Sequence, residues 1–276
     1  MSRGLDSGRH IRWRRLPQVL YRTTIDLSSS GEAMSYDELA RKFHEDGFVI
    51  VESVFSRSEI AAISDEVDRV IEGRAAYLPE NEIVYEPDTT PRRVRNAFRL
   101  HFYEQRFLDA AKHPKLIGPV KAILGKSLRL YGSQVFAKPA RVGTAVPAHQ
   151  DMPYWPFEPY ELVSAWIALD DSTVENGCVR YVAGSHKLGI LPHAPSGVPG
   201  NSLGLMDDAR VATLEERPAE VRRGSCILHH ALTVHRSEPN RSERPRRGLI
   251  YVYMSENVRL TDPGRLRGPA EFQAVS

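Results

Sequence analysis

The tripeptide His149-Gln150-Asp151 is the stretch of sequence that most directly decides the fold and chemistry of this chain. In an extended segment, side chains at positions i and i+2 point to the same side, so His149 and Asp151 face one point while Gln150 faces away. Imidazole and carboxylate groups are common metal ligands, and two of them at a strand end need a third from elsewhere in the chain. The tripeptide therefore predicts one side of a metal site.

The third ligand is expected from the downstream segment 224–240, which contains His229, His230 and His235. Two imidazoles and one carboxylate form the facial triad of non-heme iron oxygenases, which keeps half of the coordination sphere open. Arg246 lies on the strand expected after this segment, where a guanidinium can bind a carboxylate through two hydrogen bonds. These residues alone leave the choice among the three histidines open.

Further motifs surround these residues in a fixed order. They are Lys138-Pro139, Trp166, Asn176-Gly177-Cys178, Ala183-Gly184-Ser185-His186, and Ser237 and Asn240 downstream of His235. Together with the tripeptide and Arg246, this ordered set resembles the phytanoyl-CoA dioxygenase family of Fe(II)/2-oxoglutarate oxygenases. The resemblance extends from about residue 37 to about residue 253. It implies a double-stranded β-helix with the metal inside one mouth.

The resemblance also implies roles for individual residues. Ser237, Asn240 and Arg246 stand at the family's offsets from His235, which selects His235 as the third ligand and leaves His230 as a neighbour of the site or a core residue. The family uses Fe(II), 2-oxoglutarate and O2, and the distal carboxylate of 2-oxoglutarate needs a counter-charge because an unpaired buried charge is costly. The expected residues are the catalytic metal ligands His149, Asp151 and His235, and the 2-oxoglutarate contacts Arg246, Ser237, Trp166 and Gln134.

Basic residues near these motifs are expected to be structural. Strand alternation turns Arg247 outward if Arg246 points inward, so Arg247 is expected to be solvated, as is Arg244. Lys138 is expected to be a structural residue at the surface rather than a ligand.

The aromatic segment Tyr154-Trp155-Pro156-Phe157 follows the metal motif directly and is expected at the mouth of the site. Large aromatic side chains there exclude water and hold an apolar or ring-bearing substrate, so Tyr154, Trp155 and Phe157 are predicted to bind substrate. The alternative is that they cap the barrel as core residues. Residues 75–98 carry several prolines and little periodicity, which predicts a long loop that helps to cover the mouth.

Two capping boxes predict helices near the N-terminus. Ser35-Tyr36-Asp37-Glu38 opens the first helix, and Ser56-Arg57-Ser58-Glu59 opens a longer one with apolar residues at helical spacing. A strand is expected between them at 48–51, and a second helical stretch over about 104–124 breaks at Pro114.

Beyond residue 124 the pattern changes to short β-rich runs. Strands are expected at 128–137, 163–169, 178–182, 220–222, 225–228, 232–235 and 248–253. This pattern predicts a mainly β fold with flanking α: a cupin-like double-stranded β-helix (jelly roll) with N-terminal helices packed on the barrel. The expected domain covers residues 35–256, between a flexible extension over 1–34 and a C-terminal tail over 257–276.

Composition limits the class of protein. The chain has 276 residues and a formal net charge of +2, so it is long enough for a substantial core and gives no reason to expect nucleic acid or a membrane as partner. Its two cysteines, Cys178 and Cys226, are expected to be buried thiols rather than a disulfide framework. The sequence lacks a signal-peptide pattern and a long apolar run, which predicts a cytoplasmic protein. The expected partner is a small-molecule substrate, and the expected assembly is a monomer or a homodimer.

The function expected from these features is an Fe(II)- and 2-oxoglutarate-dependent dioxygenase that hydroxylates an unactivated C–H bond of a small molecule, producing succinate and CO2. Secondary metabolism is the expected setting. Desaturation, epoxidation and cyclisation remain alternatives with the same cofactors, whereas Asp151 argues against halogenation. A non-catalytic jelly roll that binds a metal or small molecule, and a zinc or nickel isomerase of the cupin type, are the alternatives from other classes.

Overall fold

The computed structural model describes residues 24–26, 35–266 and 272–275, and most of the predicted extension over 1–34 lies outside them. A nine-stranded sheet forms the larger layer. Its main path runs through β1 (Thr24–Asp26), β2 (Phe48–Glu52), β13 (Cys226–His230), β8 (Leu162–Ala168), β15 (Arg246–Ser255), β5 (Leu128–Lys138), β4 (Val94–Phe98) and β3 (Ile83–Tyr85). Strand β17 (Gln273–Ala274) pairs with β5, and all neighbours are antiparallel except β1 and β2.

A four-stranded sheet forms the smaller layer, in the order β12 (Glu216–Pro218), β9 (Val179–Val182), β14 (His235–Ser237) and β6 (Val146–His149). The hairpin of β10 (His193–Val198) and β11 (Asn201–Leu205) lies beside β6, and β7 (Phe157–Glu158) pairs with β16 (Arg259–Leu260). Short 3-10 turns occur at Glu80–Glu82, Met152–Tyr154, Ser185–Leu188, Val211–Thr213 and Pro263–Arg265. The two facing antiparallel layers confirm the predicted jelly-roll fold.

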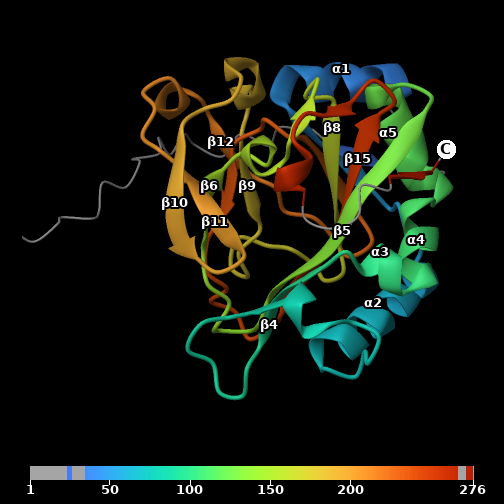
Figure 1. Ribbon diagram of the computed structural model, residues 1–276, viewed down its shortest axis with the longest axis vertical. Helices are drawn as coiled ribbons and strands as arrows, with labels where there is room; N and C mark the ends of the chain where they lie inside the picture. The colour runs from blue at the N-terminus through green and yellow to red at the C-terminus, as the bar shows by residue number, and fades with distance from the viewer. Residues whose placement is uncertain (1–23, 27–34, 267–271, 276) are drawn as a thin grey trace, which may run out of the picture.

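Helices cover the outer face of the larger sheet (Figure 1). They are α1 (Tyr36–Asp46), α2 (Arg57–Ile71), α3 (Leu100–Tyr103), α4 (Gln105–Ala111) and α5 (Pro114–Leu124). The expected box opens α2, where Ser56 and Glu59 bond each other's backbone N–H reciprocally. At α1 the Ser35 side chain accepts from the N–H of Glu38, which caps the expected helix. Pro114 stands at the first position of α5, where the missing N–H costs nothing.

Strand alternation divides the larger sheet into two faces. Val135, Ala165 and Leu249 belong to the core that packs under the helices. Trp166 and Ile250 belong to a second core on the opposite face, which looks toward the smaller sheet. Every residue of β8 is buried, because both of its faces are covered. The functional side chains of the larger sheet lie on this inner face.

Some expected elements differ in the structure. The segment 75–98 is not one long loop, since it contains β3, β4 and a 3-10 turn, with Glu86 and Arg95 fixed by internal hydrogen bonds. The strand expected at 220–222 is only an isolated bridge between Val221 and Ser172, and that expected at 232–235 begins at His235. None of the helices among residues 35–266 is long and apolar enough to cross a membrane.

Candidate metal and cosubstrate site

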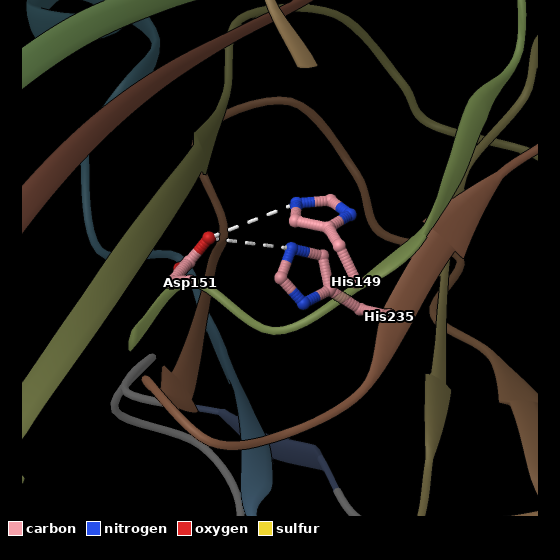
Figure 2. Close-up of side chains that lie close together, drawn as sticks. All are labelled: His149, Asp151 and His235. Carbon is pink, nitrogen blue, oxygen red and sulfur yellow. Dashed lines mark ion pairs between the residues drawn. The ribbon is translucent and has the colours of Figure 1, made fainter. Parts of the chain in front are cut away.

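Three potential metal ligands converge inside the mouth between the two sheets (Figure 2). His149 ends β6 and His235 begins β14, and the two residues are direct partners in the antiparallel pair. Asp151 lies in the turn after β6, where its Oδ1 is 3.8 Å from Nε2 of His149 and 3.8 Å from Nε2 of His235. One potential ligand atom from each residue lies within 4.8 Å of the others. The structure thus brings together the three residues predicted as ligands.

Backbone carbonyls orient both imidazoles. Nδ1 of His149 donates to the carbonyl of Pro147 at 2.8 Å, and Nδ1 of His235 donates to that of Thr233 at 2.9 Å. With Nδ1 protonated, Nε2 of each ring carries the lone pair that a metal binds. This arrangement is the usual outer shell of a histidine-ligated metal, so the residues fit the expected iron.

Asp151 is oriented by two donors on the larger sheet. Its Oδ2 accepts hydrogen bonds from Ser164 Oγ at 2.8 Å and from His229 Nε2 at 3.1 Å. Ser164 and His229 are direct partners on β8 and β13, and Nδ1 of His229 lies 3.1 Å from the hydroxyl of Tyr181. These bonds engage one carboxylate oxygen and leave Oδ1 for the metal. Sequence reasoning missed the position of His229 beside Asp151, because strand pairing creates it.

Gln150 faces away from the ligands, as the sequence predicts, and its amide fixes the turn. Nε2 donates to the carbonyls of Gly189 at 2.9 Å and Leu232 at 2.7 Å, while Oε1 accepts from the N–H of Leu191 at 2.8 Å. The amide therefore ties the turn after β6, which carries Asp151, to the loops that contain Gly189 and Leu232.

Burial sets the protonation of the ligands. It lowers the pKa of His149 and lowers that of His235 to about 3, so both rings are neutral near pH 7. Burial alone raises the pKa of Asp151, but His235 and His229 hold it below its usual range. Neutral imidazoles and an ionised carboxylate are the forms that bind metal.

Arg246 is a buried cation that has no anionic partner among the residues the structure describes. Its side chain is 1% exposed, its NH2 group donates to the carbonyl of Gly177 at 2.7 Å, and its buried Nε has no hydrogen-bond partner among the described residues. Its guanidinium carbon lies 5.4 Å from the ring centre of Trp166 and 5.9 Å from that of Phe136. Burial lowers the pKa of Arg246 to about 10. A buried, incompletely bonded guanidinium fits a carboxylate ligand such as that of 2-oxoglutarate.

The residues around Arg246 line the same cavity as the triad. Ser237, Trp166 and Gln134, predicted as further 2-oxoglutarate contacts, are all among its lining residues. Gly248 faces Trp166 so closely that an added Cβ would lie 2.3 Å from the indole nitrogen. Only glycine at this position lets the indole lie against β15.

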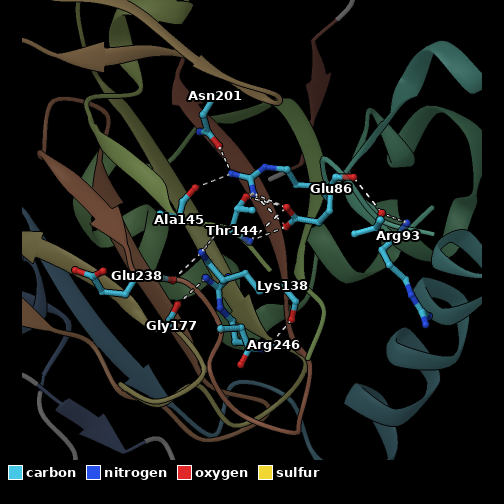
Figure 3. A network of polar contacts seen from close by, with 12 residues as sticks. Glu86, Arg93, Lys138, Thr144, Ala145, Gly177, Asn201, Glu238 and Arg246 are labelled. Carbon is cyan, nitrogen blue, oxygen red and sulfur yellow. Dashed lines mark hydrogen bonds and ion pairs between the residues drawn. The ribbon is translucent and has the colours of Figure 1, made fainter. Parts of the chain in front are cut away.

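A polar network lies behind Arg246 (Figure 3). Lys138 is fully buried, and its amino group donates to the carbonyls of Thr144 and, at 2.8 Å, of Glu238. Arg95 is likewise buried and bonds to Glu86 and Asn201. The network fixes Lys138, the strand partner of Arg246, but it does not neutralise the charge of Arg246.

The cavity has a volume of about 870 Å³ and extends from the triad toward Tyr154 and Trp155. Tyr154 also supports the β10–β11 hairpin, because its hydroxyl accepts from the N–H of Leu203 at 2.9 Å and lies 3.0 Å from its carbonyl oxygen. Tyr131 lines the cavity from a bulge in β5, with its ring centre 5.6 Å from that of Trp155. Tyr131 is not among the residues predicted from the sequence, because strand alternation alone does not locate a bulge.

Phe157 is the predicted substrate residue that the structure places elsewhere. It is buried in a separate core cluster, its ring lies 4.8 Å from Tyr131 and 5.6 Å from Phe272, and it is not among the residues that line the cavity. Phe157 therefore supports the pocket wall from behind, because β7 turns its side chain into the core. Five residues of segment 75–98 do line the cavity: Asn81, Glu82, Val84, Asn96 and Phe98.

Known proteins similar to this chain include iron- and 2-oxoglutarate-dependent dioxygenases, in agreement with the geometry of this site. The model of the family described as phytanoyl-CoA dioxygenase (PhyH) matches residues 43–248. The chain belongs to the phytanoyl-CoA dioxygenase family. It is 28% identical over 254 residues to an ectoine dioxygenase of Stutzerimonas stutzeri, covering 87% of this chain and 82% of the relative. It is 26% identical over 229 residues to a probable alpha-ketoglutarate-dependent hypophosphite dioxygenase of the same species, covering 81% and 80%.

Solved structures share the fold of this phytanoyl-CoA dioxygenase family member. The epimerase SnoN from nogalamycin biosynthesis superposes with a TM-score of 0.70 at 25% identity, covering 87% of this chain and 98% of SnoN. EctD from S. alaskensis with 2-oxoglutarate and 5-hydroxyectoine superposes with a TM-score of 0.72 at 22% identity, covering 90% and 85%.

Family membership confirms the enzyme class expected from the sequence, a 2-oxoglutarate-dependent non-heme iron dioxygenase. Iron, 2-oxoglutarate and O2 are accordingly its cofactor and cosubstrates. The chemistry of the donor set agrees, since the triad leaves room for exogenous ligands and Arg246 offers a carboxylate a buried partner.

Two expectations about basic residues in this family member are wrong. Lys138 is buried rather than at the surface, because two carbonyls accept from its amino group. Arg247 does point away from Arg246, but it is half-buried and forms ion pairs with Asp170 at 2.7 Å and with Asp68. Arg244 is exposed as expected, and both cysteines are buried free thiols.

Proposed function

We propose that this enzyme hydroxylates an unactivated C–H bond of a small molecule and converts 2-oxoglutarate to succinate and CO2. The observation that carries the proposal is the unpaired guanidinium of Arg246 in the same cavity as the triad. A chain that bound only a metal would gain nothing from a buried cation, since leaving such a charge unpaired is costly.

The proposed roles of the residues follow from their positions. His149, Asp151 and His235 hold iron, which when bound supplies the oxidising chemistry that protein side chains lack. Arg246 binds the distal carboxylate of 2-oxoglutarate, with Ser237, Trp166 and Gln134 around the cosubstrate. Ser164 and His229 keep Asp151 aligned and are positioning residues.

The substrate is proposed to occupy the part of the cavity beside Tyr154 and Trp155. The volume of about 870 Å³ is within the range of about 300–1,000 Å³ that holds a drug-sized ligand. The aromatic side chains favour a molecule with an apolar or ring-bearing part. A role in natural-product biosynthesis is supported by the fold shared with SnoN, which acts in nogalamycin biosynthesis.

Desaturation, epoxidation and cyclisation are the second candidate outcomes, because they differ from hydroxylation in substrate placement rather than in protein ligands. The fold shared with SnoK, a carbocyclase, supports keeping cyclisation among them. A non-catalytic binding protein is the candidate from another class. Formation of succinate from 2-oxoglutarate by the iron-loaded chain distinguishes an enzyme from a binder.

Metabolite extracts incubated with the enzyme, iron and 2-oxoglutarate test the proposal. We expect a compound that gains the mass of one oxygen atom, only when O2 and 2-oxoglutarate are both present. Loss of two hydrogens would instead support desaturation or cyclisation. A gain of one oxygen with loss of a C=C bond in the product would support epoxidation. An Arg246→Ala variant that forms succinate as the wild type does would contradict the proposed cosubstrate site.

A further inference from the structure

The C-terminal segment carries a cation to the mouth of the cavity. Arg265 belongs to the 3-10 turn Pro263–Arg265, and its side chain lines the cavity together with Trp155 and Tyr131. Its NH2 group donates to the carbonyl of Pro153 at 2.8 Å, which places the guanidinium beside the aromatic segment. From the sequence, residues 257–276 are expected to form a tail, with no role for Arg265.

The segment is fixed to the domain on both sides of Arg265. Strand β16 pairs with β7 before it, and β17 pairs with β5 after it. Asp262 caps the turn by accepting from the N–H of Gly264 at 2.9 Å. The ring of Phe272 lies 6.1 Å from that of Tyr131. Arg265 therefore lies on a turn that is capped by Asp262 and follows a paired strand, although its side chain is exposed.

The other charged side chains along the cavity have partners of opposite charge. Arg99 pairs with Glu82, and Arg236 belongs to a cluster of two arginines and two glutamates. In the loaded site, the two charges of Fe(II) match those of 2-oxoglutarate, and Asp151 matches Arg246. Among the described side chains that line the cavity, Arg265 is then the one whose charge has no counterpart.

We propose that Arg265 binds an anionic group of the primary substrate, which is therefore a ring-bearing acid rather than a neutral or cationic molecule. This inference rests on the proposed function, because the charge count assumes bound iron and 2-oxoglutarate. The aromatic residues hold the ring beside the triad, and Arg265 binds a carboxylate or phosphate at the rim. Such an ion pair fixes which carbon of the ring system faces the metal.

Binding of matched naphthalene probes tests the proposal without knowledge of the substrate. The chain is loaded with Mn(II) and 2-oxoglutarate, and titration calorimetry measures the affinity for 2-naphthoate, 2-naphthamide and 2-naphthylmethylamine. We expect 2-naphthoate to bind about fivefold more tightly than 2-naphthamide, the size of effect expected for an ion pair that solvent still reaches. The preference should shrink as salt increases.

Variants assign the preference to Arg265. Arg265→Gln should abolish it, Arg265→Lys should retain most of it, and Arg265→Glu should favour the ammonium probe. Arg259→Gln is the matched control, because Arg259 is exposed on the same segment and does not line the cavity. It should leave the preference unchanged.

Three outcomes overturn the proposal, and a separate titration with 2-oxoglutarate distinguishes the first two. If the wild type binds 2-oxoglutarate normally but holds 2-naphthoate and 2-naphthamide equally, only the role of Arg265 is wrong. If the wild type binds no 2-oxoglutarate, the proposed function is wrong as well. An Arg265→Gln variant that keeps the preference for the acid would also contradict the assignment.

Discussion

His149 and His235 lie directly opposite each other on the antiparallel strands β6 and β14, with ring centres 4.2 Å apart. One cross-strand pair thus supplies two of the three proposed metal ligands, and the turn after β6 supplies Asp151. Because register in a sheet is set by the pairing of whole strands, a shift by one residue would turn both rings away from the site.

His229 is predicted to strengthen metal binding through Asp151. His229→Ala removes the hydrogen bond to Oδ2 of Asp151, and outer contacts of this kind are worth roughly 10- to 100-fold in metal affinity. Equilibrium dialysis against Fe(II) without oxygen measures the change. His230→Ala is the control, since the His230 ring accepts from the N–H of Leu232, whereas Asp151 is bonded by Ser164 and His229. An equal loss in the two variants would contradict the prediction.

Arg246 is predicted to determine the affinity for 2-oxoglutarate, whereas Arg247 is predicted to stabilise the fold. Arg246→Ala should raise the concentration of 2-oxoglutarate needed for half-saturation by two or more orders of magnitude, because a buried charge left without its partner costs about 3–5 kcal/mol. Arg247→Ala should leave that concentration unchanged and lower the free energy of unfolding by roughly 1–3 kcal/mol, because Asp170 loses its charged partner. Titration calorimetry and urea unfolding separate the two effects, and a reversal between the variants would mean that the wrong face of β15 was assigned to the site.

Trp155 and Phe157 form a second contrasting pair. Trp155→Ala should reduce the fraction of 2-oxoglutarate turnover that oxidises substrate, while the affinity for 2-oxoglutarate hardly changes, because Trp155 lines the cavity. Phe157→Ala should instead lower the free energy of unfolding by about 3–5 kcal/mol, as expected for a buried aromatic residue. The ratio of product to succinate measures the first effect. Equal losses of stability and cosubstrate affinity in Trp155→Ala would favour a packing role for Trp155.

His101 is predicted to weaken the fold in acid. Its ring is 4% exposed, and burial lowers its pKa from 6.5 to about 4. Between these values the unfolded chain binds a proton that the folded chain does not, so the free energy of unfolding falls as pH decreases from 6.5 to about 4, by roughly 3 kcal/mol for this group. Urea unfolding at several pH values should show a shallower acid loss in His101→Gln than in the wild type. If the free energy of unfolding falls equally with pH in the wild type and in His101→Gln, the neutral state assigned to His101 is wrong.

Local patterns in the sequence predicted much of the fold and of the metal site. The boxes at Ser35 and Ser56 located α1 and α2 because a helix N-terminus is stabilised by neighbouring residues. His149 and Asp151 are two residues apart, so local geometry places them together. His235 was selected through the order of family motifs, since its approach to His149 depends on long-range pairing.

Features that depend on long-range pairing were missed. His229 reaches Asp151 because β13 pairs with β8, and no local signal records that register. The sequence of the β10–β11 hairpin lacks a regular alternation of apolar and polar residues, and its glycines at 197 and 200 are typical of a loop. Segment 75–98 carries strands whose burial includes Arg95, and Glu86 offsets the buried charge through a long-range pairing that propensity does not reveal.

The most direct test of the central claim is the iron content of the chain after anaerobic loading with Fe(II) and removal of free metal. We predict one iron per chain for the wild type and for His113→Ala, a variant distant from the site. Asp151→Ala and His235→Ala should retain little iron and form no succinate, although both variants should remain folded by circular dichroism. Full iron content and undiminished succinate formation in Asp151→Ala would contradict the account.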